Sequence, residues 1–252
     1  MYYPKDLVNM KNNKKISMLT CYDYSMACIL NQTDLDMLLV GDSLANIMQG
    51  HKDTIPVTID NMIYHAKAVV KGAPTKFVVV DIPFMSTYCG VDNACLNIQR
   101  VMQETGAQAV KIEGATGNEE LFKRLSLAGV PFMGHIGLTP QSYLVLGGYK
   151  KQGRTEEGAL KLKQDAKTLE ELGAFSIVLE CVPDDLAIEI TKSIQIPTIG
   201  IGAGKHTDGQ VLVINDLIGL TVNKVPSFVE TKLNIAEQIK TVVNLYSKGA
   251  NG

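Results

Sequence analysis

The stretch Leu38-Leu39-Val40-Gly41-Asp42-Ser43 joins a short apolar run to a carboxylate. Similar runs end in an acid at three more places, Val78-Val79-Val80-Asp81, Ala109-Val110-Lys111-Ile112-Glu113-Gly114 and Ile177-Val178-Leu179-Glu180-Cys181. A short apolar run flanked by turn residues is typical of a strand that is buried on both faces, as in a parallel sheet. The C-terminal ends of such strands carry the functional residues of barrels and open α/β sheets. The pattern therefore predicts a parallel α/β fold with several acids gathered at one end.

Strands and helices alternate along the rest of the chain. We predict strands over residues 16–21, 38–40, 76–80, 109–112, 130–135, 176–179 and 197–201, and an eighth near 211–214. Apolar residues at helical spacing predict helices that start near Thr58 or Asp60 and near Asp92, Asn118, Thr155 and Asp184, and a last amphipathic helix over 231–246. This count favours a closed (β/α)8 TIM barrel over an open doubly wound sheet, as a single domain over residues 1–252.

Composition and charge narrow the class of protein. Acidic residues outnumber basic ones by 26 to 24 in 252 residues, and no basic block stands out, which argues against nucleic acid as a partner. The five cysteines include no C-x-x-C pair, which favours reduced thiols. The N-terminus has no signal-peptide pattern, and no apolar run reaches the ~18 residues of a membrane span. We therefore expect a cytoplasmic protein without a membrane partner.

Three acids end consecutive predicted strands. Asp42, Asp81 and Glu113 follow the second, third and fourth runs. Neighbouring strands lie ~4.8 Å apart, so these carboxylates can share one cation. Oxygen ligands without His or Cys suit Mg²⁺, which keeps waters and accepts substrate oxygens. The alternative is that each acid caps a helix or pairs with a lysine.

Three further residues can take part in chemistry at the same end. Lys111 shares a strand face with Glu113, where it either holds a substrate carboxylate or neutralises the acids. The apolar neighbours of Glu180 would desolvate its carboxylate, which makes it a candidate general base or, alternatively, a buried structural acid. His135 ends the fifth strand and either donates a hydrogen bond to substrate or has a structural role.

Two glycine-rich segments are less specific. Residues 200–206 read Gly-Ile-Gly-Ala-Gly-Lys-His, which matches neither a P-loop nor G-x-G-x-x-G in spacing. They indicate either close approach of the backbone to a ligand or a tight turn. Residues 136–154 predict an irregular stretch, either a functional lid or a disordered loop.

With these residues in place, the sequence resembles the ketopantoate hydroxymethyltransferase family. The matching motifs run in the family's order from about residue 15 to 220 and are TCYDYS (20–25), LVGDSL (39–44), PVT (56–58), DIPFM (81–85), VKIEG (110–114), GHIGLTPQS (134–142), GGYKxQGR (147–154), LECVP (179–183) and IGIGAG (199–204). Together these motifs are highly specific, although none would be alone. The departures are Cys21, where the family often has alanine, and a short, weakly matched tail after Gly219.

The resemblance implies a barrel of the phosphoenolpyruvate/pyruvate type that assembles as a homodecamer. It also implies a role in pantothenate biosynthesis. It implies that Asp42, Asp81 and Glu113 hold Mg²⁺, Glu113 through water. The 2-oxo acid 3-methyl-2-oxobutanoate would lie beside Asp42 and Asp81. The other roles that it implies are a substrate contact for Ser43 and Lys111, a place in the pocket wall for Tyr22 and His135, and proton acceptance by Glu180. The one-carbon donor would be 5,10-methylenetetrahydrofolate.

Two alternative functions are compatible with the residues of the predicted site. A carbon–carbon lyase of the same superfamily would share the metal acids, but the Cys-Gly-His loop of those enzymes is absent from this sequence. A non-catalytic barrel that binds a carboxylate metabolite is the second. Metal-dependent loss of the C3 proton of the 2-oxo acid would separate catalysis from binding.

Overall fold

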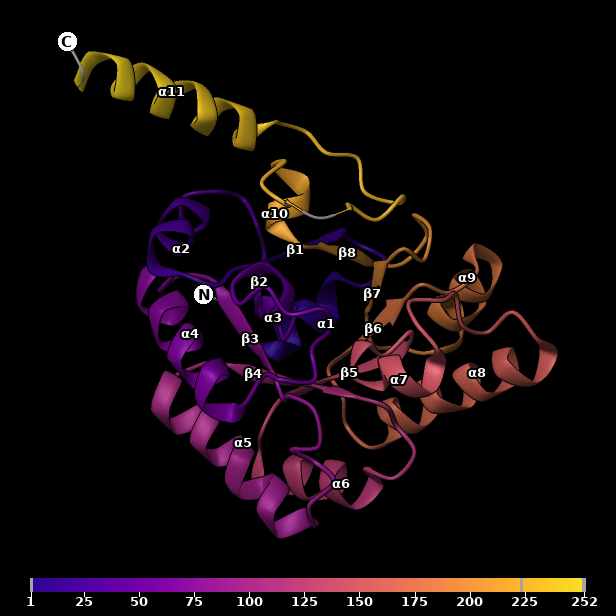
Figure 1. Ribbon diagram of the computed structural model, residues 1–252. Helices are drawn as coiled ribbons and strands as arrows, with labels where there is room; N and C mark the ends of the chain where they lie inside the picture. Colours follow the sequence, from indigo (N-terminus) through magenta and orange to yellow (C-terminus); the bar gives the residue numbers. More distant parts are fainter. Residues whose placement is uncertain (1, 223, 251–252) are drawn as a thin grey trace. The chain divides into compact units, whose positions relative to one another are not determined.

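The computed structural model describes residues 2–222 and 224–250 and contains a closed barrel of parallel strands in chain order (Figure 1). Each strand pairs with the next one along the chain, which confirms the predicted (β/α)8 fold. The strands are β1 Ile16–Thr20, β2 Met37–Val40, β3 Phe77–Asp81, β4 Ala109–Glu113, β5 Phe132–Gly137, β6 Ser176–Glu180, β7 Thr198–Ile201 and β8 Gly209–Leu212.

Helices cover the outside of the barrel. Figure 1 shows α4, α5 and α6 side by side along one flank and α8 with α9 along another. Up to β8 the helices are α1 Pro4–Met10, α2 Tyr24–Asn31, α3 Leu44–Ile47, α4 Ile59–Gly72, α5 Val91–Thr105, α6 Glu119–Ala128, η1 Pro140–Ser142 (a 3₁₀ turn), α7 Tyr143–Leu146, α8 Glu156–Glu171 and α9 Asp184–Ser193.

Two of the predicted strands begin and end two residues away from their positions in the structure. The fifth strand starts at Phe132, because Val130 N donates to Leu125 O and so closes the end of α6. The eighth strand starts at Gly209 rather than near residue 211. A Cβ added at residue 209 would lie 2.5 Å from Ile16 O. A glycine is therefore needed for β8 to approach β1.

The predicted helix starts are confirmed at three positions and wrong at two. Thr58 and Thr155 are N-caps whose side chains accept a backbone N–H, and Asn118 is the N-cap of α6 without such a bond. Asp92 and Asp184 lie inside the first turns of α5 and α9, after the N-caps Gly90 and Pro183. An acid in the first turn stabilises a helix through the N-terminal dipole, so sequence alone does not separate it from an N-cap.

α1 has no counterpart among the predicted helices, and it packs against the N-terminal ends of the strands. Its Leu7 is fully buried in the apolar core together with Met18, Phe77 and Ile199 from the strands. Seven residues carry too short a pattern to predict a helix, and tertiary packing stabilises this one.

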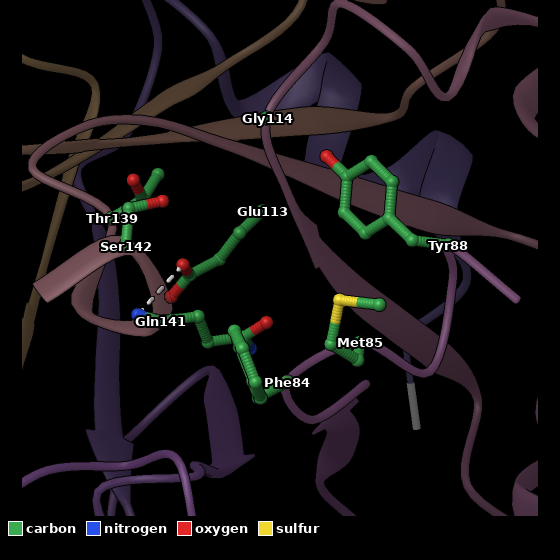
Figure 2. Close-up of a pocket in the computed structure, with 8 residues that line it drawn as sticks. All are labelled: Phe84, Met85, Tyr88, Glu113, Gly114, Thr139, Gln141 and Ser142. Atoms are coloured by element: carbon green, nitrogen blue, oxygen red, sulfur yellow. Dashed lines mark hydrogen bonds between the residues drawn. The ribbon is translucent and has the colours of Figure 1, made fainter. Parts of the chain in front are cut away.

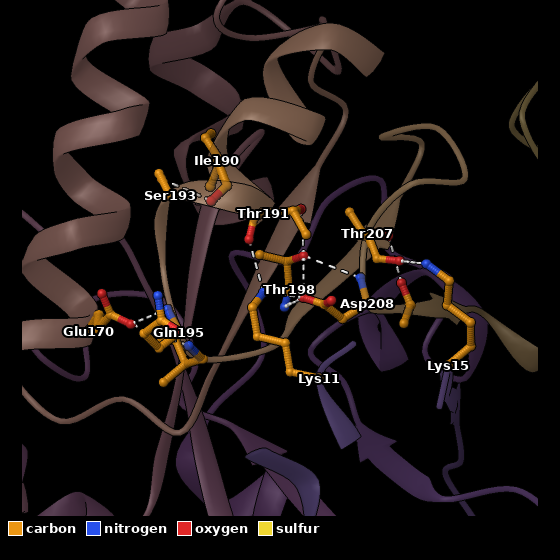
Figure 3. Close-up of polar contacts among 12 residues, drawn as sticks. Lys11, Lys15, Glu170, Ile190, Thr191, Ser193, Gln195, Thr198, Thr207 and Asp208 are labelled. Atoms are coloured by element: carbon orange, nitrogen blue, oxygen red, sulfur yellow. Dashed lines mark hydrogen bonds and ion pairs between the residues drawn. The ribbon is translucent and has the colours of Figure 1, made fainter. Parts of the chain in front are cut away.

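A buried polar cluster joins Lys11, at the end of α1, to α9 and to the starts of β7 and β8 (Figure 3). Lys11 Nζ lies 2.6 Å from Asp208 Oδ2 and donates to Thr191 O at 2.9 Å. Thr198 N donates to the same Asp208 oxygen at 2.9 Å. Both charged side chains are less than one tenth exposed, so the pair is shielded from water.

Asp208→Asn is expected to lower the free energy of unfolding by about 3 kcal/mol, because it leaves the buried Lys11 ammonium without its counter-charge. Guanidinium unfolding at one fixed protein concentration measures the change. Asp60→Asn is the matched control, since Asp60 pairs with Arg100 at the surface and should change stability by less than about 1 kcal/mol. Equal small effects of both variants would contradict the prediction.

The chain separates into two compact units, Met1–Val211 and Leu212–Gly252. The second contains α10 Ile214–Leu217 and α11 Ile235–Ala250. A single domain over residues 1–252 therefore stays a prediction. Among the described residues, no helix has both the length and the apolar content needed to cross a membrane.

Candidate active site

The barrel brings the predicted acids together at the C-terminal ends of the strands. Asp42 follows β2, whereas Asp81, Glu113 and Glu180 are the last residues of β3, β4 and β6. The register sets Asp81 level with Lys111, and Glu113 level with His135. Gly137 is level with Glu180. No side chain fits at residue 137, because its φ is +96° and a Cβ added there would lie 2.3 Å from Glu180 O.

A continuous set of contacts crosses the strand ends. Asp42 N donates to Asp81 Oδ2 at 3.0 Å, and Lys111 Nζ lies 2.6 Å from Asp81 Oδ1. Lys111 Nζ also lies 3.1 Å from His135 Nδ1. His135 Nε2 in turn lies 3.1 Å from Glu180 Oε2. Side chains on the four consecutive strands β3 to β6 therefore form one connected group, which the backbone N of Asp42 extends to the end of β2.

His135 lies between two carboxylates. Its Nδ1 is 3.4 Å from Glu113 Oε1, on the other side of the ring from Glu180. Burial and the Lys111 ammonium lower the pKa of His135, but the carboxylates of Glu113 and Glu180 outweigh them and raise that pKa to about 9. The two carboxylates therefore favour the protonated imidazole, whereas the Lys111 ammonium 3.1 Å from Nδ1 can donate only to an unprotonated nitrogen.

The buried acids shift the pKa values of Asp42 and Lys111. Burial raises the pKa of Asp42 well above its usual range, and the charges of Asp81 and Glu113 raise it further. Burial lowers the pKa of Lys111, but Asp81, Asp42 and Glu113 outweigh it and raise that pKa above the ordinary value. Acids outnumber cations here, so the group takes up either a proton or a cation.

Tyr22 and Ser43 lie beside this group. Tyr22 Oη is 2.8 Å from Ser43 Oγ, and the tyrosine is buried. Burial raises the pKa of Tyr22 above the ordinary value. The hydroxyl is therefore neutral and can act as donor or acceptor toward Ser43.

Gln141 is a residue of this site to which the sequence reasoning gave no role. It lies in η1, within the stretch 136–154 that was predicted to be irregular but contains η1 and α7. Its side-chain Nε2 donates to Asp42 Oδ2 at 2.8 Å, and its backbone N donates to Glu113 Oε2 at 3.1 Å. A lone glutamine in a loop carries no spacing signal, so only the family motif includes it.

A small cavity of about 110 Å³ opens next to Glu113 and Gln141 (Figure 2). One wall carries the exposed side chains of Phe84, Met85 and Tyr88. Met85 has a φ of +61°, a conformation that side chains rarely adopt and that occurs often at functional sites.

The predicted metal ligands at the strand ends are carboxylates. In residues 2–222 and 224–250, no group of three His, Cys, Asp or Glu side chains is arranged as a ready-made metal site. Glu113 Oε1 is nevertheless buried without a hydrogen bond to the described part of the chain. Carboxylates that converge loosely fit Mg²⁺, which is usually held by one or two carboxylates together with waters and substrate oxygens.

The glycine-rich segment after β7 forms a turn. Gly202 and Gly204 have φ of +61° and +73°, and a Cβ at residue 204 would lie 2.6 Å from Asp184 Cγ. These positions therefore meet the requirement of a tight turn, the simpler of the two interpretations.

Comparisons with known proteins agree on one family. The sequence model described as ketopantoate hydroxymethyltransferase matches residues 3–251. The 3-methyl-2-oxobutanoate hydroxymethyltransferase of Geobacillus sp. (strain WCH70) is 51% identical over 242 residues, which cover 96% of this chain and 87% of the relative. The enzyme of the same name from Bdellovibrio bacteriovorus is also 51% identical, over 96% of this chain and 92% of the relative.

Solved structures with the same fold have little sequence in common with the chain. Phosphonopyruvate hydrolase in complex with oxalate and Mg²⁺ has a TM-score of 0.63 at 10% identity and covers 99% of both chains. The phosphoenolpyruvate phosphomutase of Streptomyces platensis has a TM-score of 0.65 at 11% identity, over 98% of this chain and 87% of that one. These likenesses show the fold alone, a closed barrel of parallel strands.

Proposed function

This chain belongs to the ketopantoate hydroxymethyltransferase family, and we propose that it moves the one-carbon unit of 5,10-methylenetetrahydrofolate to 3-methyl-2-oxobutanoate. Its relatives are hydroxymethyltransferases, and the chain is an enzyme of that class. The observation that carries the proposal is the connected group from Asp42 to Glu180 on the ends of consecutive strands. One water supplies the hydroxyl oxygen, so that the products are ketopantoate and tetrahydrofolate.

Asp42, Asp81 and Glu113 would hold Mg²⁺, with Glu113 acting through water. The excess of buried acids supports this assignment, as does Glu113 Oε1, which has no hydrogen bond within the described residues. When bound, Mg²⁺ would polarise the keto group of the 2-oxo acid and lower the cost of negative charge at its oxygen.

Lys111, Ser43 and Tyr22 would bind the 2-oxo acid. The Lys111 ammonium is buried and charged, which suits a substrate carboxylate in a site shielded from water. The Tyr22–Ser43 hydrogen bond orients both hydroxyls at the pocket wall.

Glu180 would be the general base. Its carboxylate would take the proton from C3 of the 2-oxo acid, and the electron pair of the broken C–H bond would form the C2–C3 double bond of an enolate. Water would release the one-carbon unit from the folate as formaldehyde, breaking both of its carbon–nitrogen bonds and leaving tetrahydrofolate. C3 would then form the new bond to the formaldehyde carbon, and the proton held by Glu180 would pass to the resulting alkoxide oxygen. The buried Nε2 of His135 has no hydrogen bond within the described chain and lies beside Glu180, so it can donate to the substrate or hold the Glu180 carboxylate in place.

The stretch from η1 to residue 154 would cover the site during turnover. Gln141 connects its start to the acids, and α7 exposes the apolar side chains of Leu144 and Val145. Closure over a bound 2-oxo acid would exclude water from the enolate.

A product assay tests the proposed function. Ketopantoate formation from 3-methyl-2-oxobutanoate should require 5,10-methylenetetrahydrofolate and should stop when EDTA removes divalent ions. Recovery on addition of Mg²⁺ is expected. Full activity in EDTA would remove the metal from the proposal, and activity without the folate would remove the co-substrate.

We further propose a cytoplasmic homo-oligomer, expected to be a decamer from the resemblance to the family. All five cysteines are free thiols, as in a reducing compartment. In the second unit, α11 has no buried residue and exposes the apolar side chains of Ile239, Val242, Val243 and Tyr246. An exposed apolar stripe of this kind is typical of a contact surface.

Val242→Glu with Val243→Glu is expected to shift the chain to a smaller assembly, because two carboxylates would be buried in an apolar contact. Sedimentation velocity measures the assembly. The control is Gln238→Glu, a charge change on a polar residue of the same helix. A wild-type monomer, or an unchanged assembly of the double variant, would contradict the proposal.

A further inference from the structure

Gln141 lies between acids of two different strands. Its side-chain Nε2 donates to Asp42 Oδ2 at 2.8 Å and to Ile82 O at 3.0 Å. Its backbone N donates to Glu113 Oε2 at 3.1 Å, the contact drawn in Figure 2. One residue therefore fixes carboxylates from both sides of β3.

The amide geometry leaves Gln141 little freedom. The two N–H groups of the side chain serve a carboxylate and a backbone carbonyl, so the amide plane is held at both donors. Outer residues that hold ligand carboxylates in this way commonly change metal affinity about 10–100-fold when they are removed.

The position of Gln141 in the chain adds a second consequence. It belongs to η1, at the start of a segment that ends with the exposed basic residues Lys150, Lys151 and Arg154. The contacts to Asp42 and Glu113 exist only while this segment is folded against the strand ends. The arrangement of the acids and the order of the segment are therefore linked.

We propose that Gln141 is a positioning residue that couples Mg²⁺ binding at Asp42 and Glu113 to the ordering of the segment from η1 to Arg154. The proposal rests on the magnesium site of the proposed function. By reciprocity, if the ordered segment favours Mg²⁺ binding by some factor, Mg²⁺ favours the ordered segment by the same factor.

Isothermal titration of the protein with Mg²⁺, without either substrate, tests the first half. Gln141→Met keeps the length of the side chain and the backbone N–H but removes both side-chain donors. It should weaken Mg²⁺ binding by about tenfold. Gln152→Met is the matched control, because Gln152 lies in the same segment and its Nε2 donates to Lys150 O instead.

Limited trypsin digestion tests the second half. In the wild type and in Gln152→Met, saturating Mg²⁺ should slow cleavage after Lys150, Lys151 and Arg154 by about the same factor, tenfold. In Gln141→Met, Mg²⁺ at its own saturating concentration should leave that cleavage rate unchanged. Cleavage outside the segment serves as the internal reference.

The failures are distinguishable. A wild type that takes up no Mg²⁺ would overturn the magnesium site of the proposed function and this inference with it. A wild type that binds Mg²⁺, together with a Gln141→Met variant of equal affinity or equal Mg²⁺-dependent protection, would overturn the coupling alone.

Discussion

Glu180→Gln is expected to lower kcat by roughly 10²–10⁴-fold while leaving the binding of 3-methyl-2-oxobutanoate nearly intact. The amide keeps the shape of the carboxylate at the end of β6 but cannot accept the C3 proton. Turnover of ketopantoate and equilibrium binding of the 2-oxo acid are the two measurements.

Glu189→Gln is the matched control for this variant. Glu189 pairs with Lys163 at the surface, so the same substitution there should leave kcat unchanged. If Glu180→Gln loses binding along with turnover, Glu180 is a structural acid, which is the alternative that the sequence left open.

Asp81→Asn is expected to weaken Mg²⁺ and the 2-oxo acid together, each by tenfold or more on the scale of lost ligand-shell contacts. The variant removes a charge that lies against both the metal site and Lys111. Lys111 would then be buried near one acid fewer, and its hold on a substrate carboxylate would change as well. Titrations with each ligand measure the two losses.

The exposed acid Asp92, which pairs with Arg124, gives the control Asp92→Asn. This variant should bind both ligands as the wild type does. If Asp81→Asn keeps the metal dependence of the wild type, Asp81 lies outside the coordination shell, and the three-acid site is wrong.

Much of this site could be predicted from the runs that end in Asp42, Asp81, Glu113 and Glu180. A buried parallel strand has a strong local signature, and the fold then brings the strand ends to one rim. The contact of Lys111 with Asp81 follows from the strand register that such a barrel imposes. His135 is level with Val178 and contacts Glu180 two residues further along β6, which the register alone does not predict.

Other parts depend on contacts between distant segments and leave no local pattern. α1 is a short helix that is stabilised by the burial of Leu7 and by the Lys11–Asp208 pair. Gln141 meets Asp42 across 99 positions of the sequence, so no spacing indicates it. The acids lie at one end of the barrel, but they form no closed three-ligand group among the described residues.

The most direct test of the account is hydrogen exchange at C3 of 3-methyl-2-oxobutanoate, followed by NMR in deuterated water without any folate. We expect this exchange if Asp42, Asp81 and Glu113 hold Mg²⁺ and Glu180 accepts the proton. The exchange should then need Mg²⁺, stop in EDTA and be lost in Glu180→Gln. Exchange that continues in EDTA, or in the Glu180→Gln variant, would contradict it.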